Sequence, residues 1–313
     1  MKKIIILLPV YNDWQSLQLL ISKIEKILSG NIFNAKIVVV DDGSTKLPKN
    51  KTHSHLFDGL LIHLQRNVGH QRAIALGIAY VSDNLEDWEN LIVMDADGED
   101  LPEDILKLLE VADENPDKVI FAHRRKRQEG FKFKLGYFIY KLLFEVLTGK
   151  KITFGNFSLI PKSLSRKISF LSEIASHYSG GIIKSKLPYY LVSVERGKRL
   201  TGKSKMNFPS LVLHGLSSIA VHADIVALRL LSASFLMIVT ASIVVLIVLY
   251  IRFFTELATP GWATTVVSGA LVLITQVFFL SFSLLFLILT YRSQNQFVPT
   301  LHYKQYVDRV VFF

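Results

Sequence analysis

The stretch LIVMDADGE, Leu91 to Glu99, joins a short apolar run directly to a cluster of acidic side chains. The four apolar residues have the composition of a strand that is buried on both faces of a sheet. The three carboxylates that follow repel one another unless a cation or protons compensate their charge. We interpret the stretch as a buried strand that ends at a ligand site.

Four more apolar runs resemble this strand, and helical patterns separate several of them. Apolar side chains recur at helical spacing over residues 17–28, and further helices are expected to begin near His70 and at Pro102. The alternation predicts an α/β fold with a mainly parallel, Rossmann-like sheet that is covered on both faces. The other predicted strands are Ile4–Leu8, Lys36–Val40, Leu60–Leu64 and Val119–Ala122.

Polar residues cluster just after three of these strands, at Pro9–Asp13, Asp41–Ser44 and Asp95–Asp97. Ligands of open α/β sheets bind at the carboxyl ends of the strands, where the strand order reverses. Any one of these loops alone is typical of a turn or a helix cap. Together they predict a single site.

The cluster of Asp95, Asp97 and Glu99 is expected to bind a hard divalent cation, Mg²⁺ or Mn²⁺. Such cations prefer carboxylate oxygens and bridge them to substrate phosphates. An Asp-x-Asp pair alone occurs in many surface turns. Its place directly after a buried strand favours the metal site here.

Composition narrows the class of protein. The chain has 313 residues, half of them apolar, and no cysteine, which excludes disulfides and thiolate metal sites and fits a reducing cytoplasmic setting. The apolar run at residues 4–10 ends without a small-residue cleavage site, so we interpret it as a strand and not as a signal peptide.

Two long uncharged segments, residues 230–251 and 257–291, exceed the roughly 20 apolar residues that span a bilayer. Buried helices of a soluble protein are the alternative. A turn at Thr259–Trp262 separates the segments, so they are expected to form a transmembrane hairpin. Residues 132–147 and 209–221 are typical either of interfacial amphipathic helices or of packed core helices.

The net charge of +10 is distributed unevenly. Up to His123 there are 19 acidic and 12 basic residues, whereas residues 124–205 hold 19 basic and 4 acidic ones. A basic segment before a membrane hairpin indicates anionic headgroups or a phosphate ligand, and it places the domain on the cytoplasmic side. Nucleic acid is a weaker alternative, because no nucleic-acid recognition motif accompanies the charge.

The ordered set of motifs resembles glycosyltransferase family 2, which has the GT-A fold. Its polyprenyl-phosphate branch, which includes dolichyl-phosphate mannose synthase and the bactoprenol glucosyltransferases, is similar over about 290 residues. The motifs that carry the resemblance are Pro9–Asn12, Val40–Ser44, Arg66–Gln71, Asp95–Glu99, Arg124–Arg127, Gly155–Leu159 and Arg196 with Arg199–Lys205.

The resemblance implies domain bounds and site residues. It predicts a cytoplasmic GT-A domain at 1–208, a juxtamembrane amphipathic segment at 209–227, transmembrane helices at 228–254 and 263–291, and a cytoplasmic tail at 292–313. The residues expected around the nucleotide-sugar are Pro9, Tyr11, Asp13, Asp42 and Gly69, and Asp42 is expected to contact the base. The metal is expected to be held by Asp95, Asp97 and Glu99. The residues expected to bind phosphate or diphosphate are Arg124, Arg127, Arg196, Arg199 and Lys205; membrane-surface electrostatics is the alternative for any one of them.

One position departs from the family. Asn156 stands where relatives often have aspartate, and an amide cannot act as a general base. A phosphomonoester acceptor has a second pKa near 6 and reaches the site already ionised at neutral pH, so reaction remains feasible without a base.

The sequence thus predicts a metal-dependent, inverting transferase that moves a sugar from a UDP- or GDP-sugar to a polyprenyl phosphate. A family 2 transferase for another lipid or a polysaccharide, and a non-catalytic membrane subunit, stay open. The absence of a Gln-x-x-Arg-Trp motif and the presence of only two spans count against a processive synthase. The sugar and any homo-oligomerisation are left undetermined.

Overall fold

The computed structural model describes residues 2–29, 33–46, 54, 56–124, 140, 142–150, 154–202, 208–255, 261–293 and 297–313. The chain divides into two compact units. The first comprises residues 1–141, 151–221 and 296–313 and contains the sheet, and the second comprises residues 142–150 and 222–295 and is helical.

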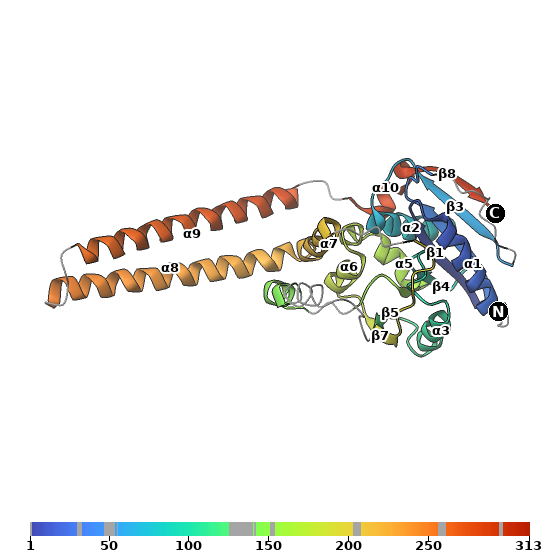
Figure 1. The fold of residues 1–313 in the computed structure, drawn as a ribbon, viewed down its shortest axis with the longest axis horizontal. Coiled ribbons are helices and arrows are strands. Elements are labelled where there is room, and N and C mark those ends of the chain that lie inside the picture. The colour runs from blue at the N-terminus through green and yellow to red at the C-terminus, as the bar shows by residue number, and fades with distance from the viewer. Residues whose placement is uncertain are drawn as a thin grey trace. The chain divides into compact units, whose positions relative to one another are not determined.

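The described residues of the first unit form one eight-stranded sheet in the order β7-β5-β6-β4-β1-β2-β3-β8 (Figure 1). Strands β1 to β4 pair in parallel, whereas β6 and β8 run antiparallel to their neighbours. The strands are β1 (Lys2–Val10), β2 (Phe33–Asp41), β3 (Gly59–Leu64), β4 (Asn90–Val93), β5 (Val119–Arg124), β6 (Ser158–Pro161), β7 (Tyr189–Val194) and β8 (Val307–Phe312).

The strand order reverses between β1 and β4. The chain runs from β1 outward through β2 and β3, then returns across the sheet to place β4 on the other side of β1. The carboxyl ends of β1 and β4 therefore meet at the switch point, where open α/β sheets bind ligands. This order brings the loop after Val10 beside the loop after Val93.

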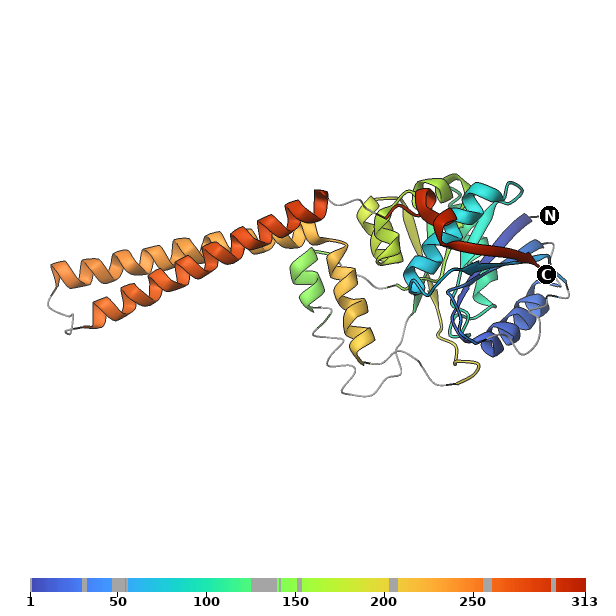
Figure 2. The same cartoon turned by 90° about the horizontal axis from the view of Figure 1, so that it is seen from above.

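Helices cover both faces of the sheet (Figure 2). In β1, Ile4, Ile6 and Leu8 belong to one buried cluster, while Ile5 and Leu7 belong to the other. Successive strand side chains point to opposite faces, so a strand buried on both must be apolar throughout. The helices of this unit are α1 (Trp14–Leu28), α2 (His70–Asn84), α3 (Asp104–Glu114), α5 (Lys162–Ser169), η1 (Ser172–Ala175), α6 (Tyr178–Ser185), α7 (Phe208–Ala220) and α10 (Pro299–Tyr306).

The predicted fold class is confirmed, and all five predicted strands form within a few residues of their expected bounds. Helix α3 begins at Asp104, two residues after the expected Pro102. Residues 132–139 and 141 of the first expected interfacial helix lie outside the described residues, and its residues 142–147 are helical. The sequence did not indicate β6, β7 or β8.

The C-terminal segment differs from the expected tail, because α10 and β8 complete the first unit. Strand β8 pairs antiparallel with β3, and Gly59 and Phe313 exchange two backbone hydrogen bonds of 2.9 and 3.0 Å. Tyr303 of α10 is buried and its hydroxyl accepts a hydrogen bond from Asn84 of α2 at 3.1 Å. The chain therefore rejoins the sheet after the long helices.

The second unit is built on α8 (Ala223–Phe254) and α9 (Trp262–Ser293), which pack side by side (Figures 1 and 2). Both are long and apolar enough to cross a membrane, with mean hydropathies of 2.7 and 2.5. Thirty-two residues span about 48 Å, more than the hydrocarbon core of a bilayer. The most apolar window of α9 has no buried residue, which argues against the soluble-core alternative.

The pairing of β8 with β3 predicts the sidedness of the chain. Strands joined by hydrogen bonds must lie on the same side of a membrane, so α8 and α9 must cross it an even number of times in total. We expect Thr45→Cys and Asp308→Cys to respond alike to an impermeant thiol reagent in intact cells, and Trp262→Cys to respond oppositely. The wild type is a clean background because it has no cysteine. Opposite labelling of the first two positions would contradict this topology.

Candidate active site

Arg199 joins the loops that follow β1 and β4. Its guanidinium donates to Oδ2 of Asp13 at 2.6 Å and to Oδ2 of Asp97 at 3.3 Å. A third hydrogen bond, from Nε to the carbonyl of Thr201 at 3.1 Å, orients the guanidinium. All three charged side chains are about four-fifths buried. The planar fork of arginine suits two carboxylates at fixed positions.

The acidic loop after β4 is held by its own carboxylates. Asp100, which is buried, accepts a hydrogen bond from the backbone N–H of Asp95 at 3.0 Å, and Asp97 accepts one from that of Glu99 at 2.9 Å. Gly98 between them has φ +83°, and a Cβ there would overlap the side chain of Leu200. Asp100 is not among the residues predicted from the sequence, although it extends the acidic run.

Each of the three carboxylates expected to bind metal faces a cationic or titratable partner. Asp95 lies 3.0 Å from Nε2 of His70, and Glu99 accepts hydrogen bonds from Arg196 at 2.5 and 3.1 Å. Burial, followed by repulsion from Asp95 and Glu99, raises the pKa of Asp97. Burial opposes a charge on His70, but attraction by Asp95 outweighs it and raises the pKa of His70.

These residues fit a divalent cation in part. Asp95 and Asp97 are two oxygen-bearing side chains whose mutual repulsion a cation would relieve. Glu99 is occupied by Arg196 and can join them only if that ion pair opens. Among the residues that the structure describes, no three acidic or histidine side chains are grouped as a metal site. The metal therefore remains a prediction that Asp95 and Asp97 support best.

Asp42, at the end of β2, holds the loop before α2. Its two carboxylate oxygens accept hydrogen bonds from the backbone N–H groups of Val68 at 2.7 Å and Gly69 at 3.1 Å. The residue is 3% exposed, and burial raises its pKa to about 6 despite these bonds. Gly43 beside it has φ +64°, and a Cβ there would overlap the backbone of Arg66. The two loops are thus in direct contact.

The remaining residues expected at the nucleotide lie at the same edge. Pro9 is buried near the end of β1, and Tyr11 follows it with 41% of its surface exposed. Asp13 precedes α1 at its N-terminus, and the backbone N–H of Asn12 donates to Ser44 at 2.8 Å. The structure therefore brings together the three loops that the sequence singled out.

Asn156 lies beside this edge and contacts two neighbours from the start of α2. Gln71 donates to its Oδ1 at 3.2 Å, and Nε2 of His70 lies 3.1 Å from its Nδ2. His70 therefore stands between Asn156 and Asp95. The sequence placed His70 and Gln71 in a family motif but assigned them no role.

Three of the predicted basic residues cannot be placed. The backbone of Arg124 ends β5, but its side chain, together with Arg127 and Lys205, lies outside the described residues. Arg196 and Arg199 are described, and both contact the acidic loop.

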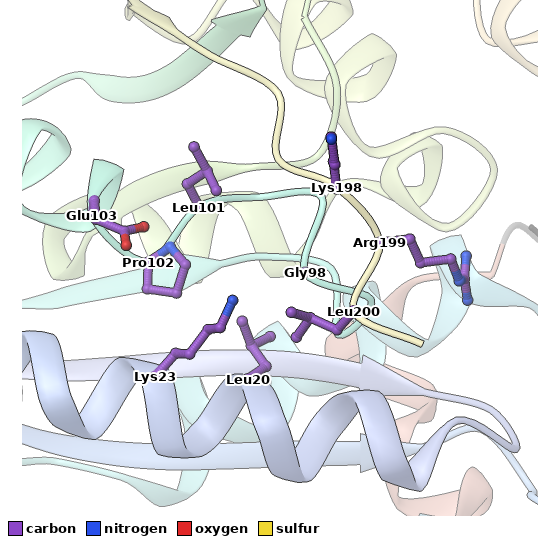
Figure 3. A pocket seen from close by; sticks show the side chains of 9 residues that line it. All are labelled: Leu20, Lys23, Gly98, Leu101, Pro102, Glu103, Lys198, Arg199 and Leu200. Carbon is purple, nitrogen blue, oxygen red and sulfur yellow. The ribbon is translucent and has the colours of Figure 1, made fainter. Parts of the chain in front are cut away.

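A pocket of about 280 Å³ lies between α1 and the loops at residues 98–103 and 198–200 (Figure 3). Lys23 rises from α1 below the loop of Gly98, and Lys198 and Arg199 come from the second loop. Of the residues predicted at the site, only Arg199 lines this pocket. The other predicted site residues that contact Arg199 are Asp13 and Asp97, which do not line the pocket.

The first part of the chain matches a known protein family. Residues 5–174, more than half of the chain, match the model described as glycosyl transferase family 2. The uncharacterized glycosyltransferase YkcC of Bacillus subtilis is 28% identical over 269 residues, 84% of this chain and 81% of that protein. The undecaprenyl-phosphate 4-deoxy-4-formamido-L-arabinose transferase of Yersinia enterocolitica is 30% identical over 174 residues, 53% of this chain and 50% of that transferase.

Solved structures share the fold. Mannosyl-3-phosphoglycerate synthase of Rubrobacter xylanophilus aligns with a TM-score of 0.51 and 15% identity, covering 71% of this chain and 73% of that one. Glucosyl-3-phosphoglycerate synthase of Mycobacterium tuberculosis, in complex with Mn²⁺, UDP-glucose and phosphoglyceric acid, aligns with a TM-score of 0.52 and 13% identity, covering 72% and 80%.

The raised pKa of Asp42 predicts a pH-dependent contribution to stability. An acid whose pKa is raised by folding binds its proton more tightly in the folded chain. The protonated carboxyl of Asp42 therefore stabilises the fold at low pH, and this contribution is lost as the pH rises from 3.8 to about 6. The loss is about 3 kcal/mol, since one pKa unit corresponds to about 1.4 kcal/mol. We expect the melting temperature of Asp42→Asn in detergent to rise relative to that of the wild type across this window and to keep a constant difference above it. A difference that does not change between pH 4 and pH 7 would contradict this origin of the shift.

Proposed function

The chain belongs to glycosyltransferase family 2, and on that premise we propose that it transfers a sugar from a UDP- or GDP-sugar to a polyprenyl phosphate at the cytoplasmic face of a membrane. The acceptor class is supported by the undecaprenyl-phosphate transferase among its relatives. It is supported independently by the two apolar helices, which would keep the enzyme where a lipid acceptor resides.

The observation that carries the proposal is the double ion pair of Arg199. It fixes Asp13, from the loop expected at the nucleoside, against Asp97, from the loop expected at the diphosphate. A nucleotide-sugar that contacts both loops needs a fixed distance and a fixed orientation between them. Asp42 and Gly69 complete the nucleoside side, and Tyr11 offers an exposed ring beside them.

In the proposed reaction an oxygen of the acceptor phosphate attacks the anomeric carbon of the sugar. The bond from that carbon to the diphosphate breaks, the nucleoside diphosphate leaves, and the anomeric configuration inverts. A Mg²⁺ or Mn²⁺ ion held by Asp95 and Asp97, and by Glu99 once its ion pair with Arg196 opens, would supply positive charge to the departing diphosphate. Arg199 adds a fixed cation at the same place.

The acceptor arrives as a dianion at neutral pH, so no side chain has to remove a proton from it. The acceptor phosphate must instead be held close to other anions. Cationic side chains favour this placement. We assign this role to Arg124, Arg127, Arg196, Arg199 and Lys205. The basic segment they belong to also favours the cytoplasmic side, so Thr45 should be shielded from impermeant reagents in intact cells.

Replacing Asp97 with asparagine should abolish transfer and leave the fold intact, because the change removes a carboxylate from a loop and no core group. The assay offers a panel of labelled nucleotide-sugars with a prenyl phosphate and counts the lipid phase. Asp117→Asn, in the exposed turn after α3, is the matched control and should stay active. Full activity of Asp97→Asn, or of the wild type in excess chelator, would end the metal hypothesis.

Wild-type transfer should rise with pH as the acceptor phosphate loses its second proton near pH 6, and then level off. Lys205→Gln should reduce the rate more than Asn156→Ala, because an ionised acceptor depends on cations more than on a base. Lys203→Gln is the matched control for a nearby lysine. A wild type that is inactive on every nucleotide-sugar and revived by Asn156→Asp would favour the non-catalytic alternative.

A further inference from the structure

The amide of Gln71 has only one allowed orientation. Its Oε1 lies 2.5 Å from the backbone nitrogen of Tyr178, at the first residue of α6. A backbone N–H can only donate, so the oxygen of Gln71 must face it. The NH₂ group of Gln71 must then face Asn156.

The orientation of the Gln71 amide determines the orientation of the Asn156 amide. Because Gln71 presents a donor, the atom of Asn156 that lies 3.2 Å from it must be the oxygen Oδ1. The NH₂ group of Asn156 therefore points the other way, to Nε2 of His70 at 3.1 Å. Nε2 of His70 is also 3.0 Å from Asp95, which places this NH₂ group next to the acidic loop.

Tyr178 also fixes the backbone of Asn156. The hydroxyl of Ser158 lies 2.7 Å from that of Tyr178 and donates to the carbonyl of Asn156 at 3.0 Å. Tyr178 is fully buried, and burial raises the pKa of its phenol, so the hydroxyl keeps its proton. Asn156 is thus held at both its side chain and its main chain by one residue of α6.

We propose that Gln71 is a positioning residue that locks the amide of Asn156 with its N–H groups directed into the site, so that position 156 acts as a hydrogen-bond donor. Gln71 itself need not touch a substrate. Where relatives carry an aspartate, the same place would hold an acceptor.

The consequence for the reaction rests on the proposed function. An oxygen of an ionised phosphate repels a carboxylate but accepts a hydrogen bond from an amide. Nε2 of His70 can accept one N–H of Asn156 only when its own proton is on Nδ1 and it is not donating to Asp95, and in either case one N–H of Asn156 remains for an anionic acceptor. The locked amide therefore selects acceptors that reach the site already ionised.

The near-isosteric variant Gln71→Glu tests this directly. One carboxylate oxygen still accepts from Tyr178, but the other now faces Asn156 as an acceptor, so the amide of Asn156 must turn its NH₂ away from the site. We expect kcat/KM for the prenyl phosphate to fall about tenfold, the effect of one hydrogen bond to a charged group, with little change in KM for the nucleotide-sugar.

A double-mutant cycle separates positioning from the added charge. If Gln71→Glu acts through Asn156, the double variant Gln71→Glu/Asn156→Ala should be no slower than the slower single variant. Effects that multiply to about a hundredfold would overturn the proposal. If Gln71→Glu does not fold, Gln71→Met with Asn156→Ala gives the same cycle and the same decision.

The orientation also has a signature independent of transfer. In full-length protein labelled with [¹⁵N]asparagine, a side-chain proton of Asn156 should shift downfield in Gln71→Glu, because it then donates to a carboxylate. Asn156→Ala assigns the signal. An unchanged signal would overturn the proposal even if the enzyme is active. A wild type that transfers no sugar to prenyl phosphate would instead reject the proposed function and leave the amide shift to be measured.

Discussion

The ion pairs of Arg199 with Asp13 and Asp97 hold two loops together at the point where the strand order reverses. All three groups are largely buried, and the planar guanidinium holds one carboxylate from each loop. The loop of Arg199 is also joined to the acidic loop by two backbone hydrogen bonds of 2.9 Å, from Leu200 to Asp97 and from Gly197 to Glu99. The guanidinium that joins Asp13 to Asp97 therefore comes from a loop after β7 that is itself bonded to the acidic loop.

Around this centre the site is organised by hydrogen bonds that run from main chain to side chain. Asp42 accepts hydrogen bonds from two backbone N–H groups. Asp100 accepts one from the N–H of Asp95, and Gln71 accepts one from the N–H of Tyr178. Main-chain donors cannot reverse their direction, so the N–H of Tyr178 fixes which end of the Gln71 amide faces it. A transferase whose acceptor is already ionised gains more from such fixed donors and cations than from a general base, and Asn156 fits that requirement.

The return of the chain to the sheet places a constraint on the membrane-facing half. Strand β8 pairs with β3 after α8 and α9, so the helical pair is tied to the catalytic unit at both of its ends. The ladder between β3 and β8 requires both ends of the helical pair to lie on the same side of any membrane that the pair crosses.

The sequence by itself determined the α/β class, the strands β1 to β5, the two apolar helices and the loops after β1, β2 and β4, because each of these rests on local periodicity or on a short run of like residues. It also led to Asn156 through a family motif. Only the tertiary structure decided the partners: Arg199 meets Asp13 across 186 positions, and Gln71 meets Tyr178 across 107. Strand β8 is a similar case, since most of its residues are exposed and its pattern lacks the buried alternation that marks a strand. Such contacts depend on where the sheet order brings distant segments together, and no local pattern encodes that order.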